Sequence, residues 1–211
     1  MKYSENGIIN RAALKAAARE KLKGNLWNLW KPLLVMFLVG SVAGFAGAIF
    51  GEDSAIAQII GVVIEILVLP ASAGLIVYLL NFTRGKKFDI KDLLTYYDKR
   101  VLNLLLLEIV VGLFTFLWSL LFIIPGIIAA LSYSMVMYIF VDETKTDTME
   151  IIRESKRMMD GYKWDYCVFG LSFILCYLFV GVTFGIAAIY VVPYQMVAQT
   201  MYYEEVKAIK G

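Results

Sequence analysis

Two acidic side chains lie deep inside apolar segments, and they are the residues of this sequence best placed to do chemistry. Glu65 and Glu108 each lie near the middle of a stretch that is otherwise uncharged. An ionised acid at the centre of a bilayer costs roughly 2.5 to 3.5 kcal/mol, so we expect both to be protonated or hydrogen-bonded and to point into the protein. They would then form either a proton or cation site, or a pair of neutral acids that hold helices together.

Most other chemistries lack the residues that they need. The sequence has no histidine, and its two cysteines, Cys167 and Cys176, fall on opposite faces of one expected helix, where we interpret them as small buried apolar residues. It also has no Gly-rich phosphate loop and no serine beside a candidate base. A hydrolase that pairs Glu65 with Glu108 is the one enzymatic chemistry left open. We expect no enzyme, no metal site and no cofactor.

The segments that carry these acids are long and apolar. Of the 211 residues, 60% are hydrophobic, and four stretches are too long and too uncharged for a soluble domain of this size. A hydrocarbon core of about 30 Å needs roughly 20 apolar residues per helix. The first two stretches therefore cross once each, and the last two have the length for two crossings. We predict an all-α membrane domain over residues 32–206 with six transmembrane helices, at about 32–50, 56–82, 101–117, 119–141, 164–181 and 184–206.

The positive charges test this topology independently. All 20 Lys and Arg residues fall into four segments, which lie between Lys2 and Lys31, Arg84 and Arg100, Lys145 and Lys163, and Lys207 and Lys210. The positive-inside rule places all four in the cytoplasm, which requires an even number of crossings between each pair. We therefore expect three helical hairpins, both termini in the cytoplasm, a retained first helix and no cleavable signal peptide. The cytoplasmic parts are then an amphipathic helix within residues 1–31 and interfacial loops or helices at 83–100 and 142–163.

Proline spacing suggests that the three hairpins are copies of one unit. Pro70, Pro125 and Pro193 each follow branched apolar residues in the second half of a hairpin. The acidic turn at residues 51–54 places Pro70 well inside the second helix. By analogy we expect Pro125 inside the fourth helix, after a turn near residues 118–119. Such prolines kink helices. The kinks either improve packing only, or open a cavity between helices two, four and six with four candidate lining residues, Glu65, Glu108, Ser132 and Gln195.

Helix termini and basic residues mark the cytoplasmic segments. Asn10 is a candidate N-cap, and Asp147 begins a capping-box pattern whose helix would stop at Gly161. After Asn10, one stripe of cations recurs every four residues: Arg11, Lys15, Arg19 and Lys23. This stripe either contacts anionic headgroups of the inner leaflet or serves only to hold the N-terminus inside. In the first apolar helix, Gly40 with Gly44 and Gly47 with Gly51 form two GxxxG pairs, which indicate close helix contact within one chain or between two.

Several of these motifs together resemble a known family. They are the segments 22–27, 117–134, 154–164, 171–173 and 193–204. In combination they are similar to the bacterial membrane-protein family catalogued as domain of unknown function 975, over nearly the whole chain. The resemblance implies a polytopic membrane protein, found mainly in Gram-positive bacteria. It implies no activity and no site residues.

Two classes of function follow from these patterns. We expect a small, non-enzymatic protein of the cytoplasmic membrane that acts as an accessory, scaffold, stress or immunity factor. Its partners would be membrane lipids and either a second copy or another membrane protein, and not nucleic acid. The alternative is a carrier or binding protein for a small molecule, lipid or peptide in the cavity between the kinked helices. The size, 211 residues, favours the accessory.

Overall fold

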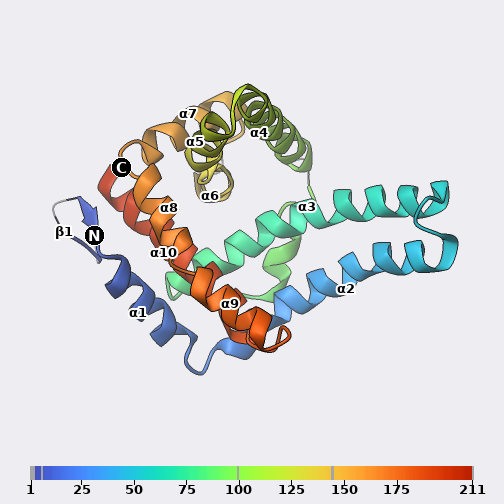
Figure 1. Ribbon diagram of the computed structural model, residues 1–211, viewed down its shortest axis with the longest axis horizontal. Coiled ribbons are helices and arrows are strands. Elements are labelled where there is room, and N and C mark those ends of the chain that lie inside the picture. The colour runs from blue at the N-terminus through green and yellow to red at the C-terminus, as the bar shows by residue number, and fades with distance from the viewer. Residues whose placement is uncertain (1–2, 6, 99, 144, 211) are drawn as a thin grey trace. The chain divides into compact units, whose positions relative to one another are not determined.

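The computed structural model is almost entirely helical and describes residues 3–5, 7–98, 100–143 and 145–210 (Figure 1). One short antiparallel hairpin, β1 (Ser4–Glu5) with β2 (Ile8–Ile9), precedes the helices. Among the described residues, five helical segments are long and apolar enough to cross a membrane. This agrees with the predicted all-α class and with a membrane protein. The chain divides into two compact units, one formed by residues 27–105 and the other by residues 1–26 and 106–211.

The first of these units is built on two long helices. α2 (Leu26–Phe50) and α3 (Ala55–Thr83) have 25 and 29 residues, which at about 1.5 Å per residue is more than a bilayer core needs. The turn between them, Gly51 to Ser54, contains Gly51 at φ +86°, a backbone conformation that glycine adopts without strain. Few side chains of α2 are covered: the buried ones are Leu29, Pro32 and Ala46.

A short helix packs on α3 in this unit. The 3-10 helix η1 (Ile90–Leu94) begins at a capping box in which Asp89 accepts from the Lys91 amide and Asp92 accepts from the Asp89 amide. η1 packs directly on α3, where Gly74 has no side chain to separate the two backbones. Leu93 is buried as a result, and the segment 83–100 contains a folded element rather than an open loop.

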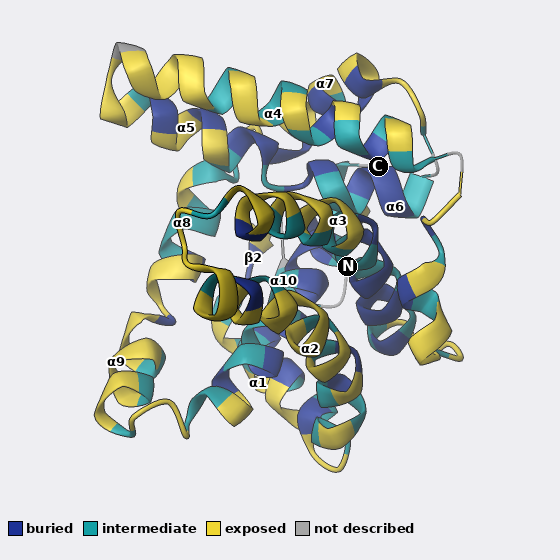
Figure 2. Cartoon of the chain, turned by 90° about the vertical axis from the view of Figure 1, so that its right-hand side faces the viewer, coloured by how far each residue is buried: buried dark blue, intermediate teal, exposed yellow. Residues whose placement is uncertain are grey.

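The second unit has α10 (Ala188–Lys210) at its centre. α1 (Arg11–Leu22), α7 (Thr148–Met159) and α9 (Ile174–Val182) all pack on it. Because several helices cover it, α10 buries polar as well as apolar residues, including Thr200 and Glu205. Figure 2 shows α10 rich in buried residues and α4 and α9 rich in exposed ones. The predicted caps are confirmed: Asn10 accepts from the Ala13 amide, Asp147 accepts from the Met149 amide, and Gly161 follows α7 with φ +83°.

The hairpin around Pro125 differs from the prediction. α4 (Val101–Leu121) continues past residues 118–119, the break falls at Phe122, and α5 (Ile123–Tyr133) begins immediately after it. Pro125 therefore lies in the first turn of α5 and not deep inside a helix. A proline is tolerated there because its φ suits the helix start and its missing N–H would have no intrahelical partner. Gly126 then allows α5 to approach α4 closely, because a Cβ at this position would collide with the side chain and the Cα of Ser119.

The remaining helices are interrupted more often than predicted. The expected fourth helix, 119–141, is formed by α5 and α6 (Val136–Glu143), which are separated at residues 134–135. The expected fifth helix, 164–181, is formed by α8 (Lys163–Leu171) and α9, with a break at Ser172 and Phe173. Pro70 and Pro193 lie inside α3 and α10, as predicted. Short helices of this kind are placed by packing against their neighbours more than by their own stability.

Candidate functional site

The two membrane acids occupy different environments. Glu65 lies on the part of α3 where Val62, Val63 and Ile66 are also exposed, and its own side chain is exposed. The prediction that Glu65 points into the protein is therefore wrong. Glu108 is half-buried on α4. The two acids belong to different compact units.

The other two candidate cavity residues already have hydrogen-bond partners. Ser132 is buried on α5, donates to the carbonyl of Ile128 at 2.7 Å, and its own carbonyl accepts from the Ser155 hydroxyl of α7 at 2.8 Å. Gln195 on α10 accepts from the Tyr177 hydroxyl of α9. Ser132 thus joins α5 to α7, whereas Gln195 joins α10 to α9.

The basic stripe of α1 faces the protein more than we predicted. Arg11 forms an ion pair with Asp165 at 3.5 Å, Lys15 donates to the Ser172 hydroxyl at 2.9 Å, and Arg19 donates to the Tyr194 hydroxyl at 3.2 Å. Partial burial lowers the pKa of the Lys15 ammonium. Lys23 is exposed.

The apolar side of α1 is covered as well. Leu14, Ala18 and Leu22 are buried in the unit that contains α10. Amphipathicity requires an apolar partner without specifying lipid or protein, and here protein covers the apolar side of the helix. An open groove of about 660 Å³ remains beside the stripe, bordered by α1 residues with Val168 and Ser172 of α8 and its C-terminal end.

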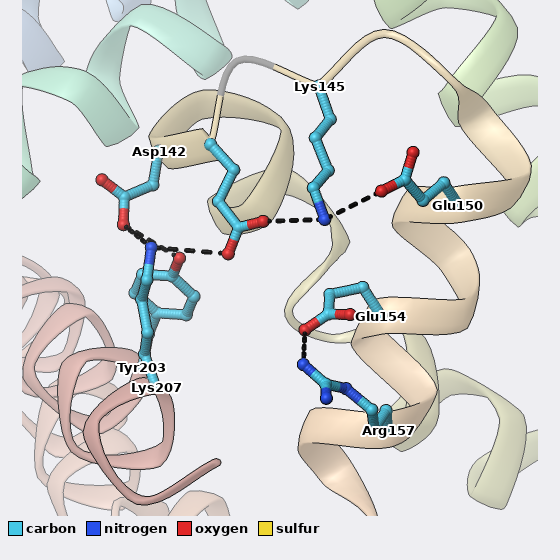
Figure 3. A network of polar contacts seen from close by, with 8 residues as sticks. Asp142, Lys145, Glu150, Glu154, Arg157, Tyr203 and Lys207 are labelled. Atoms are coloured by element: carbon cyan, nitrogen blue, oxygen red, sulfur yellow. Dashed lines mark hydrogen bonds and ion pairs between the residues drawn. The ribbon is translucent and has the colours of Figure 1, made fainter. Parts of the chain in front are cut away.

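Ion pairs and hydrogen bonds connect the C-terminal end of α6, the start of α7 and the C-terminal part of α10 (Figure 3). Lys207 Nζ lies 2.7 Å from Asp142 and 3.4 Å from Glu143, and the Tyr203 hydroxyl donates to Asp142 at 3.1 Å. Lys145 continues the chain to Glu143 at 3.0 Å and Glu150 at 3.1 Å, and these hydrogen bonds raise the pKa of its ammonium. This network fixes the start of α7 relative to α10.

A pocket bordered by residues of α5 and α7 was not predicted from the sequence. We call it the α5–α7 pocket; it is open, has a volume of about 620 Å³, and is bordered by α4, α5, α7 and α8. Its apolar wall contains Trp118, Pro125, Ile128 and Ala129, whereas its polar wall contains Lys156, Arg157, Asp160 and Lys163, with Ser132 and Tyr133 between them. Lys156 Nζ is 5.4 Å from the centre of the Tyr133 ring.

A second pocket, in the unit of α2 and α3, has a different character. It measures about 340 Å³ and is lined by apolar residues of both helices and η1, with Lys91 and Tyr97 at its polar positions. Tyr97 donates its hydroxyl to the Leu67 carbonyl. This pocket offers apolar surface and little to orient a charged ligand.

These features define the class of the chain: a helical protein with five segments able to span a membrane and with charged clusters beside them. Comparison with known families gives one match. The model of the family described as "Protein of unknown function (DUF975)" matches residues 8–130 and 120–210. The chain belongs to this family, as its motifs suggested. No curated protein and no solved structure matched it.

Proposed function

We propose that this protein is a non-enzymatic accessory of the bacterial cytoplasmic membrane, of the scaffold, stress or immunity type, acting through helix contacts. The observation that carries the proposal is the uncovered surface of α2. A Cβ built at Gly40 or Gly44 would meet no described atom within 4 Å, and Phe37, Phe45 and Ile49 are largely exposed. A face of small residues flanked by aromatic rings suits close approach of a helix from a partner or a second copy.

We also propose a topology of three hairpins with all basic segments on one side and with α10 as the last span. Trp118 and Lys156 border one pocket, so the turn between α4 and α5 lies on the same side as α7 and this middle hairpin does not cross the membrane completely. The 23 residues of α10 reach about 34 Å at 1.5 Å per residue, enough for a bilayer core. Its low hydropathy fits its burial, because a helix surrounded by protein needs no continuous apolar face. All basic residues then fall on the cytoplasmic side with both termini.

The carrier alternative has less support. It needs polar groups that converge on one cavity, yet Glu65 is exposed, and Ser132 and Gln195 each contact a neighbouring helix. Pro125 does not interrupt a helix interior, so one of its three expected kinks has no physical cause.

A photo-crosslinking experiment tests the accessory role. With benzoylphenylalanine in place of Phe45, which is 72% exposed, we expect adducts with a second polypeptide in native membranes. The matched control is Phe169, which is 1% exposed and should crosslink only within the chain. A differently tagged second copy separates self-association from another partner. Adducts with lipid alone at Phe45 would contradict the proposal.

Cysteine labelling tests the topology. In a variant whose Cys167 and Cys176 are replaced by serine, Asp53→Cys should react with an impermeant maleimide in intact cells. Lys86→Cys and Lys156→Cys should react only after permeabilisation, because the positive-inside rule places them in the cytoplasm. Labelling of either lysine position in intact cells would refute the three-hairpin arrangement with cytoplasmic termini.

A further inference from the structure

We propose that the α5–α7 pocket binds the headgroup of an anionic phospholipid, with the lipid chains along its apolar wall. The pocket has a cationic wall and an apolar wall, which match the charged headgroup and the hydrocarbon chains of an anionic lipid. The basic α1 stripe, by contrast, is largely engaged by protein side chains. This site is independent of the α2 surface on which the accessory role rests.

The charges on the polar wall favour an anion. Three cations, Lys156, Arg157 and Lys163, border the pocket with one acid, Asp160. Arg157 is also paired with Glu154 at 2.6 Å, which occupies one side of its guanidinium and orients it. Among the residues that the structure describes, neither Lys156 nor Lys163 forms an ion pair. Both ammonium groups therefore remain available to a phosphate, to which lysine binds as a point charge.

Packing holds this wall in place before any ligand arrives. α7 buries Ile151, Ile152, Met158 and Met159, while Lys156 and Arg157 lie on its exposed side. The hydrogen bond from Ser155 to the Ser132 carbonyl fixes α7 to α5 next to Lys156. The cations therefore approach the pocket from a helix whose rotation is set by its own core.

The apolar wall indicates a lipid and not a soluble phosphate. Trp118 and Ile128 are both 47% exposed at the pocket. The turn just beyond them is uncharged and exposes Leu120, Phe122 and Ile123, so the pocket adjoins a surface suited to hydrocarbon. A free phosphate would use the cations alone, whereas a phospholipid uses both walls, with Trp118 in the interfacial position that tryptophan favours.

Lipid retention by the full-length protein tests this site. The protein is reconstituted in phosphatidylcholine nanodiscs with a small fraction of phosphatidylglycerol, and bound lipid is measured by native mass spectrometry after transfer to detergent. The double variant Lys156→Gln/Lys163→Gln should bind phosphatidylglycerol about 30-fold more weakly, since two cations near a phosphate each contribute comparably to binding. The charge-conserving Lys156→Arg/Lys163→Arg should retain it.

A matched control separates the site from net charge. Lys86→Gln/Lys87→Gln removes the same charge from an exposed segment and should leave retention unchanged. Trp118→Ala should weaken phosphatidylglycerol binding without changing any competition by inorganic phosphate. The proposal is overturned if both double variants lose retention equally, if phosphatidylcholine is retained as well as phosphatidylglycerol, or if millimolar inorganic phosphate alone displaces the lipid and Trp118→Ala has no effect. A failure of the Phe45 crosslinking experiment would contradict the accessory role, but it would not change the expected lipid retention, because the two surfaces are separate.

Discussion

Gly74→Ala should destabilise the unit of α2 and α3 by about 3 kcal/mol, close to the upper end of what overpacking costs. A Cβ at this position would lie 2.5 Å from the Leu93 Cα and 2.6 Å from the carbonyl oxygens of Asp92 and Leu93. All three atoms are backbone, so no side chain can rotate away. η1 would have to leave α3, which would expose Leu93 and open the capping box at Asp89.

The measurement is the free energy of unfolding in mixed micelles, together with proteolysis of the segment 83–100. Gly61→Ala is the matched control, because it lies in the same helix and its Cβ would meet no described atom within 4 Å. It should be neutral or stabilise the helix by about 0.5 to 1 kcal/mol. Equal losses for the two variants would show that η1 does not pack on α3 as described. Unchanged proteolysis of Gly74→Ala would show the same.

Local features of this fold could be predicted from the sequence because their causes are local. Asn10 and Asp147 cap their helices through amides two or three residues away, so the pattern is readable in a short window. The acidic turn at 51–54 interrupts two apolar runs, and the helices end and begin around it. The helical class followed in the same way from the length of the apolar stretches.

Errors arose where the sequence leaves a choice of partner. The apolar strip of α1 requires covering, but only tertiary structure shows that protein covers it in the unit of α10. Pro125 was placed by analogy with Pro70, although a proline suits a first turn as well as an interior kink. Glu65 was placed inward from the cost of burial alone, whereas the covering of each face of α3 decides its exposure.

The α5–α7 pocket could not have been predicted from spacing. Its walls come from four helices, and residues that border it together, such as Trp118 and Lys163, are far apart in the sequence. One local signal did exist: Lys156 and Arg157 lie opposite the buried face of an amphipathic helix. That signal predicts the face of the helix that carries the cations, but it does not predict which other helices border the same pocket.

Asp142→Ala should lower the free energy of unfolding by about 2 to 3 kcal/mol, because Asp142 accepts the hydrogen bonds that join the end of α6 to α10. The Asp142 side chain is 8% exposed and accepts from the Tyr203 hydroxyl and from Lys207. Tyr203 is fully buried, so the loss of Asp142 removes the acceptor of a buried hydroxyl. Lys207, which is 34% exposed, keeps Glu143 at 3.4 Å and contributes the smaller part of the loss.

The expected order of variants follows from these contacts and is measured by unfolding in mixed micelles. Asp142→Asn keeps an oxygen for Tyr203 and loses only the charge opposite Lys207, so it should cost about 1 kcal/mol. Glu154→Ala removes an acid whose partner Arg157 is 64% exposed, and it should cost less than about 0.5 kcal/mol. In a cycle with Tyr203→Phe, Asp142→Ala should show a coupling of about 1 kcal/mol. Additive losses in that cycle would mean that Asp142 stabilises the fold without its bond to Tyr203, and that the Lys207 ion pairs and side-chain packing hold α6 to α10.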